Sequence, residues 1–92
     1  MTDVDWDDIS FVISSRYRIV GMQRLSVGPA TPSQIAQDEE VGLSHVSRAL
    51  QELRDRGLVT LLVSDNRNKG RVYGLTEQGA DVWERIEAEN MI

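Results

Sequence analysis

The sequence contains no cysteine and only one histidine, His45, among its 92 residues. Without thiols the chain can form neither a disulfide framework nor a thiolate metal site, and one histidine leaves few ways to build a metal centre or an acid–base pair. The chain also lacks the glycine-rich P-loop and GxGxxG patterns that bind nucleotides. These absences leave no recognisable catalytic set, so we expect no enzyme activity, no metal site and no cofactor.

Long apolar runs are also missing: no stretch reaches 18 apolar residues, and no signal-peptide pattern occurs. We therefore expect a cytoplasmic protein with no membrane contact. Apolar residues make up 40% of the chain, which is enough to fold, and 92 residues suit one core. The sequence predicts a single domain over residues 1–92, with an acidic segment at residues 1–8.

Positive charge is scarce overall but concentrated in one region. The net charge is −5, yet residues 44–71 hold six basic and three acidic residues, a net of +3, which leaves −8 on the rest of the chain. A basic patch on an acidic body can bind DNA in a salt-dependent way. A surplus of surface acid is also typical of proteins from very salty cytoplasms.

Residues 44–56, with the sequence SHVSRALQELRDR, predict one short helix with two different faces. Its apolar stripe follows the i, i+3, i+4, i+7 spacing and consists of Val46, Ala49, Leu50 and Leu53. The outer face and its shoulders carry small polar and basic side chains: Ser44, His45, Ser47, Arg48 and Gln51. Gly57 suits the left-handed residue that ends a helix. Such an outer face fits the DNA major groove, where Arg48 can pair with guanine and Gln51 with adenine.

Two helices are predicted before this one. Ser14 or Ser15 can cap a helix over residues 16–26, which is apolar on two sides and therefore sandwiched between neighbours. The run Thr31-Pro32-Ser33-Gln34 forms a capping box that starts a second helix ending near residue 38 or 39. Gly42 lies in the turn that follows, and the connection reads as a little long for a minimal turn. A helix, a glycine-containing turn and a second helix form a helix-turn-helix unit.

A β-hairpin and a last helix are predicted after Gly57. Residues 58–63 and 71–75 read as strands around a polar loop at 64–70. The hairpin carries a cluster of basic residues: Arg67, Lys69 and Arg71. Thr76 can cap a helix over residues 77–89, with Ala80 on its apolar side. We also expect a helical turn or two from about residue 5.

Several apolar side chains outside the helix-turn-helix unit are candidates for a dimer surface. They are Trp6, Tyr17, Val20, Trp83 and Ile86. A packing role in the core is the alternative for Trp83, and docking onto the domain is the alternative for Trp6.

The runs TPSQIA, GLSHVSRALQELRDRGLV and KGRVYGLTEQG closely resemble winged helix-turn-helix transcription regulators of the MarR-like and ArsR-like class, especially small archaeal versions. The resemblance covers about residues 16–86. It implies an α+β fold with a three-helix core, a two-stranded β-wing and a C-terminal helix. It also implies that Ser44, His45, Ser47 and Arg48 lie in the major groove, with Arg67 and Lys69 at the wing. The thiol ligands of ArsR-like metal sensors are absent, so we expect no metal sensing.

Two functions from different classes follow. The leading hypothesis is a sequence-specific transcription regulator that binds double-stranded DNA, with the helix at 44–56 in the major groove and the wing at 64–71 on the backbone or minor groove, as a homodimer on a two-fold site. The alternative, favoured by the net charge of −5, is a winged-helix module that binds other proteins without DNA. The sequence identifies no small-molecule effector.

Overall fold

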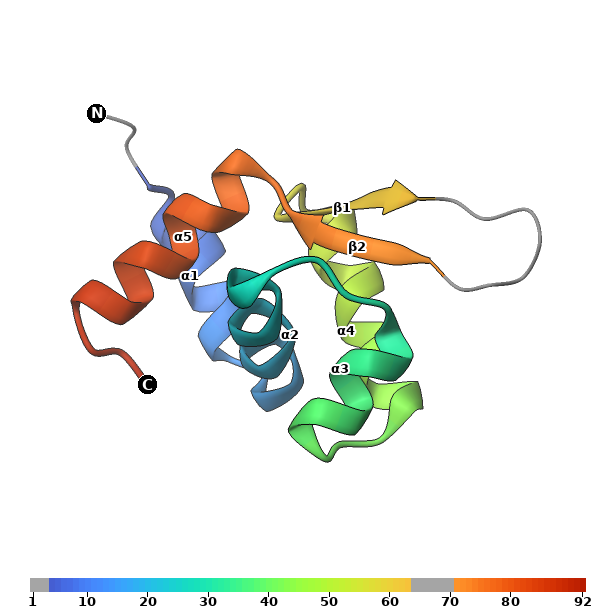
Figure 1. Ribbon diagram of the computed structural model, residues 1–92. Helices are drawn as coiled ribbons and strands as arrows, with labels where there is room; N and C mark the ends of the chain where they lie inside the picture. The colour runs from blue at the N-terminus through green and yellow to red at the C-terminus, as the bar shows by residue number, and fades with distance from the viewer. Residues whose placement is uncertain (1–3, 64–70) are drawn as a thin grey trace.

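The computed structural model describes residues 4–63 and 71–92, which form five helices and one β-hairpin (Figure 1). The helices are α1 (Trp6–Ile13), α2 (Arg16–Val27), α3 (Pro32–Glu39), α4 (Leu43–Asp55) and α5 (Glu77–Ala88). The strands are β1 (Val59–Val63) and β2 (Val72–Leu75). The expected α+β fold, with a three-helix core, a two-stranded wing and a C-terminal helix, is therefore confirmed. None of the helices in these ranges is long and apolar enough to cross a membrane.

Side-chain caps fix where four of these helices begin. Asp5, Ser15 and Thr76 accept hydrogen bonds from backbone N–H groups in the first turns of α1, α2 and α5. At α3 the Thr31 hydroxyl accepts from Gln34 N at 3.1 Å, and Thr31 N donates to Gln34 Oε1 at 2.9 Å. This reciprocal pair gives partners to the backbone N–H groups of Thr31 and Gln34, which the start of a helix otherwise leaves without a hydrogen bond. The predicted capping box is thus confirmed.

The turn between α3 and α4 is shorter than the sequence indicated. Only three residues link the helices, because Glu40 adopts the left-handed conformation with φ 55° and Gly42 already caps α4. Val41 N donates to Ala36 O at 3.0 Å and its side chain packs against the core. The interpretation of a long connection was wrong, since α3 continues to Glu39 and α4 begins before Ser44.

Helix α4 ends at the glycine that the sequence predicted. Gly57 has φ 81°, its N–H donates to Arg54 O at 2.9 Å, and Leu58 N donates to Leu53 O at 3.0 Å. This pair of bonds satisfies the last free carbonyls of the helix and turns the chain back. Leu58 and Leu53 are both fully buried, so the turn directs the chain straight from α4 into β1.

The hairpin is held against the start of α3 by a third segment. Strands β1 and β2 are antiparallel, with Val59 opposite Leu75 and Leu61 opposite Tyr73. Ala30 pairs with Tyr73 through two backbone bonds of 3.1 and 2.9 Å. No local pattern predicted this bridge, which fixes the position of the wing relative to the helix-turn-helix unit. The loop at 64–70, with Arg67 and Lys69, lies outside the described residues.

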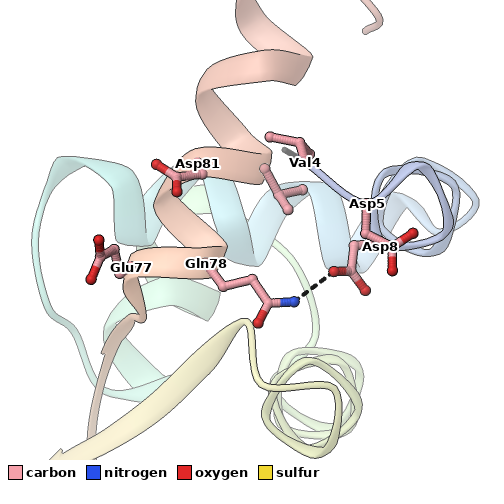
Figure 2. Close-up of a pocket in the computed structure, with 7 residues that line it drawn as sticks. Val4, Asp5, Asp8, Glu77, Gln78 and Asp81 are labelled. Carbon is pink, nitrogen blue, oxygen red and sulfur yellow. Dashed lines mark hydrogen bonds between the residues drawn. The ribbon is translucent and has the colours of Figure 1, made fainter. Parts of the chain in front are cut away.

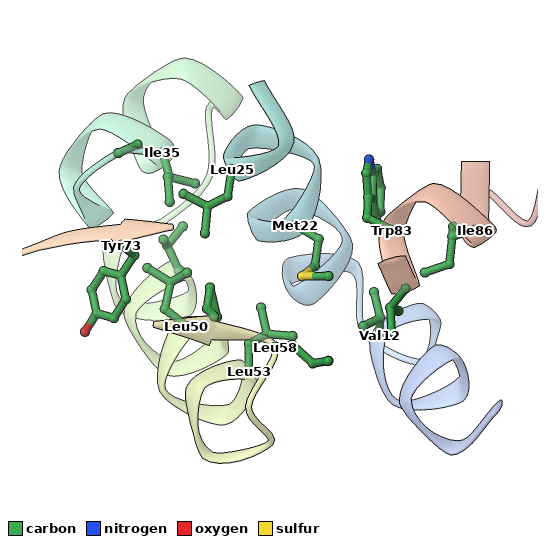
Figure 3. Packing of buried hydrophobic residues seen from close by; sticks show 14 of the residues in the cluster. Val12, Met22, Leu25, Ile35, Leu50, Leu53, Leu58, Tyr73, Trp83 and Ile86 are labelled. Carbon is green, nitrogen blue, oxygen red and sulfur yellow. The ribbon is translucent and has the colours of Figure 1, made fainter. Parts of the chain in front are cut away.

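One hydrophobic cluster joins every described helix and both strands (Figure 3). Helix α2 contacts α1, α3, α4, α5 and β2, so it lies between the helix-turn-helix unit and the two terminal helices. The apolar residues on both sides of α2 therefore pack against other elements of the same chain. Trp83 and Ile86, predicted as candidates for a dimer surface, lie in this cluster with 3% and 0% of their surface exposed.

Helix α5 is packed against the backbone that follows α4. A Cβ atom at Gly79 would lie only 1.9 Å from Leu58 O, so the close approach requires glycine. The Thr76 hydroxyl donates to Gly57 O at 2.7 Å and anchors the same turn. Because Gly79 faces Leu58, Ala80 is turned to the surface, and the prediction that Ala80 lies on the apolar side was wrong.

Candidate nucleic-acid interface

Helix α4 separates its predicted recognition residues cleanly from its buried face. Its buried residues are Val46, Ala49, Leu50 and Leu53. Its exposed residues include all five candidates for base contact: Ser44, His45, Ser47, Arg48 and Gln51. The Arg48 side chain is 84% exposed, and its Nε lies 3.9 Å from Glu52 Oε2. An exposed ion pair this long holds its partners weakly, so the Arg48 guanidinium is free to reach a ligand.

A cavity of about 500 Å³ lies beside this exposed face. Residues from α3, α4 and the wing line it: Thr31, Pro32, Ser33, Leu43, Ser47, Gln51, Arg71 and Tyr73. None of these described lining residues carries a carboxylate. The two helices of the helix-turn-helix unit and the exposed Arg71, next to β2, therefore form one groove of mixed polar and apolar side chains.

Sequence reasoning missed the contributions of Leu43 and of the α3 N-terminus to this groove. Leu43 is the first residue of α4, and 49% of its surface is exposed. Thr31 and Ser33 belong to the run that was predicted as a helix start only. No local signal in the sequence places them at the groove, because it is the bridge from Ala30 to Tyr73 that brings this helix start beside the wing.

His45 does not project freely from α4. Its ring stacks on Tyr17 of α2, with 4.4 Å between the ring centroids and 7° between the planes. The two residues also line a cavity of about 240 Å³ with Ser15, Arg18, Arg48 and Glu52. Tyr17, which was predicted as a candidate for a dimer surface, lies next to α4 with its ring against His45.

The other charged side chains of α4 connect it to the helices behind. Arg18 of α2 donates from Nε to Glu52 Oε1 at 3.1 Å and stacks over the Phe11 ring at 3.9 Å. Arg56 donates from Nε to Asp8 Oδ1 at 2.7 Å, and this hydrogen bond raises the pKa of Arg56. These pairs link α4 to α1 and α2 without using its outer face.

A second cavity, of about 420 Å³, lies between the start of α1 and α5 and has the opposite character (Figure 2). Four carboxylates line it: Asp5, Asp8, Glu77 and Asp81. Asp8 is only 4% exposed, and its second oxygen accepts from Gln78 Nε2 at 2.6 Å. No group of three or more potential metal ligands occurs within residues 4–63 and 71–92.

A helix-turn-helix unit followed directly by a β-hairpin defines the winged helix-turn-helix class, and solved structures share this fold. Reduced YodB from B. subtilis superposes with a TM-score of 0.78 at 17% identity, over 99% of this chain and 90% of that one. Mb0332 from Mycobacterium bovis, described as a homodimeric DNA-binding domain of a possible ArsR-family regulator, gives 0.75 at 19% over 92% and 77%. NMB1585, a MarR family regulator from Neisseria meningitidis, gives 0.73 at 18% over 84% and 55%.

The predicted resemblance to MarR-like and ArsR-like winged helices is thus confirmed at the level of the fold, which is what identities below 25% establish. The chain spans only about half the length of NMB1585. No curated protein matches the sequence. Residues 6–90 match the family model of the HVO_A0261 N-terminal domain, and the chain belongs to that family.

Proposed function

We propose that this chain is the sequence-specific DNA-binding domain of a transcription regulator. Helix α4 lies in the major groove of double-stranded DNA, and the hairpin contacts the backbone or the minor groove. The carrying observation is the continuous exposed surface formed by the outer face of α4, the start of α3 and Arg71. A single exposed helix face with small polar and basic side chains fits a groove that admits one helix and presents hydrogen-bonding base edges.

Different side chains on this surface suit different parts of a duplex. Arg48 pairs with guanine O6 and N7, and Gln51 with adenine. Ser44, Ser47 and the α3 start are short or helix-terminal donors that suit phosphate oxygens. The exposed Leu43 provides an apolar contact for a thymine methyl group. Arg71 extends the positive charge toward the backbone, as do the predicted wing residues Arg67 and Lys69.

Selection of bound duplexes from a random library, followed by fluorescence anisotropy at several salt concentrations, tests the proposal. We expect one enriched sequence class. We also expect the logarithm of the affinity to fall linearly with the logarithm of salt, by about 0.9 per phosphate contact. A protein that shows no sequence preference and no salt-dependent binding across the library contradicts the regulator function.

The active form is proposed to be a homodimer on a two-fold site. On α1, Trp6 and Ile13 lie seven residues apart on one helix face and are 55% and 38% exposed. A second copy would cover this surface, whereas Tyr17 faces His45 and Val20 is partly buried. Sedimentation of wild type and Trp6→Ala tests it, with Val27→Ala as a control for an exposed apolar residue elsewhere. A wild-type monomer at high concentration in both low and high salt contradicts the dimer.

A protein-interaction module without DNA binding is the competing function. The observation in its favour is the acidic cavity between α1 and α5, which repels phosphate and suits a basic protein partner. The same library experiment separates the two functions, because a pure interaction module recovers no enriched duplex.

A further inference from the structure

The stacked pair of Tyr17 and His45 lies at the edge of the proposed DNA-binding surface. Tyr17 belongs to the first turn of α2 and His45 to the first turn of α4. Their centroids are 4.4 Å apart and their planes are nearly parallel, at 7°. His45 is exposed and Tyr17 is partly buried, so the stack stands at the rim between the core and solvent.

The stack is not needed to hold the two helices together. Gly21 of α2 packs directly on Leu50 and Leu53 of α4, which approach the position of its missing Cβ to 3.7 Å. Arg18 and Glu52 add an ion pair between the same helices. The stack at the rim, with His45 exposed, adds less burial than these contacts, and its distinct consequence is the orientation of the imidazole.

The imidazole is restricted on one face, where Tyr17 stacks against it. Its Cδ2 edge lies beside Gly42, where a Cβ atom would be only 3.1 Å away, so the glycine leaves room for the ring in this orientation. Stacking fixes the plane of the ring, and with it the direction in which an N–H can donate. An exposed histidine without such neighbours would exchange between rotamers and would lose that freedom on binding.

We propose that Tyr17 is a positioning residue that holds the His45 imidazole so that its N–H donates to the N7 atom of a purine in the major groove. An imidazole carries at least one N–H in each of its protonation states, and N7 is an acceptor on both guanine and adenine. The pair therefore selects purine over pyrimidine at one position of the site. This inference rests on the proposed DNA-binding function and assigns Tyr17, which contacts no base itself, to sequence selection.

Selection of duplexes from a random library with four variants tests the proposal. We expect wild type to prefer purine at one position by about fivefold, the ratio expected for one hydrogen bond. His45→Ala removes this preference, and Tyr17→Leu reduces it to less than about twofold while the preferences at other positions and the salt dependence stay unchanged. Tyr17→Phe keeps a ring for stacking and restores the preference. The double variant Tyr17→Leu/His45→Ala behaves as His45→Ala alone.

A chemical probe makes the assignment specific. Replacing the selected purine by its 7-deaza analogue, which lacks N7, should weaken wild-type binding about fivefold and leave His45→Ala unchanged. Thermal unfolding of each variant checks the fold, and Tyr17→Met replaces Tyr17→Leu if the latter unfolds.

The outcomes separate the positioning role of Tyr17 from the DNA-binding function on which it rests. If wild type selects a sequence but Tyr17→Leu keeps the purine preference, or if the 7-deaza duplex binds as well as the parent, the positioning role is overturned and the DNA-binding function stands. If wild type selects no duplex, the DNA-binding function fails and the positioning role fails with it.

Discussion

The folded molecule has two regions of opposite chemistry, one at each end of its structure. In Figure 1 helices α3 and α4 and the hairpin lie to the right, and α1 and α5 lie to the left with both termini. The described residues that line the groove at α3, α4 and β2 include Arg71 and no carboxylate, whereas four carboxylates line the cavity between α1 and α5. A net charge of −5 therefore describes neither region. Binding is decided by the local distribution of charge, which can favour DNA at one end and repel it at the other.

The two regions are physically joined by α2 and by contacts at the end of α4. Asp8 of α1 accepts from Arg56 at the end of α4 and from Gln78 of α5, and Gly79 rests on the Leu58 backbone. We therefore expect the ends to fold together but to bind ligands separately.

Gly79→Ala should cause the largest loss of stability, because its Cβ would lie 1.9 Å from the Leu58 carbonyl oxygen and backbone must move to accommodate it. We expect the free energy of unfolding to fall by about 3 kcal/mol, the upper range for overpacking. Gly28→Ala is the matched control, since its Cβ would meet nothing within 4 Å. Chemical denaturation measures both. If Gly79→Ala is as stable as Gly28→Ala, the contact of α5 with the Leu58 backbone does not hold the two regions of the molecule together.

Arg48→Ala should weaken binding to the selected duplex by about tenfold to a hundredfold, because a guanidinium paired with guanine is lost. Arg85→Ala removes the same charge at the acidic end, where Arg85 pairs with Glu89, and should change the affinity less than about twofold. Fluorescence anisotropy at fixed salt measures both variants. Equal losses would mean that only the total charge matters, and the contrast between the two ends would disappear.

Asp8→Ala should lower the free energy of unfolding by about 1 to 2 kcal/mol, because it removes the acceptor of the bonds from Arg56 and Gln78. Arg56 is half exposed and regains water, which keeps the loss moderate. Glu84→Ala on the exposed side of α5 is the control. We expect duplex affinity to stay within about twofold. A large loss of affinity in a folded Asp8→Ala protein would show that the two ends are coupled in binding.

Replacing thymine by uracil at each position of the selected duplex should weaken wild-type binding about threefold at the position next to Leu43, the value of one buried methyl group. The Leu43→Ala protein should not distinguish the two bases there. Val27→Ala, which removes an exposed apolar side chain away from the groove, should behave as wild type. A uracil effect that survives in Leu43→Ala assigns the methyl contact to another residue.

Local signals in the sequence predicted most of the fold. The Thr31–Gln34 capping box, the Ser15 and Thr76 caps and the left-handed Gly57 are each defined within one turn of chain, so spacing alone identifies them. The alternation of faces on α4 also follows from periodicity and placed five candidate site residues on the exposed side.

Contacts between distant parts of the chain were not predictable in the same way. The Tyr17–His45 stack, the Ala30–Tyr73 bridge and the buried Asp8 depend on how helices and strands pack, which no local pattern encodes. The placement of Trp83 and Ile86 in the core has the same cause, because their periodicity identifies an apolar face without identifying its partner. The missed part of the candidate site, Leu43 with the α3 start, also arises from such packing.

A map of backbone amide chemical shifts in the labelled protein during titration with the selected duplex shows directly which of the two regions binds DNA. We expect large changes at the start of α3, along the outer face of α4 and at Arg71. We expect small changes at the residues that line the acidic cavity, Asp5, Asp8, Glu77 and Asp81. Changes concentrated at α1 and α5, with α4 unaffected, would contradict this expectation.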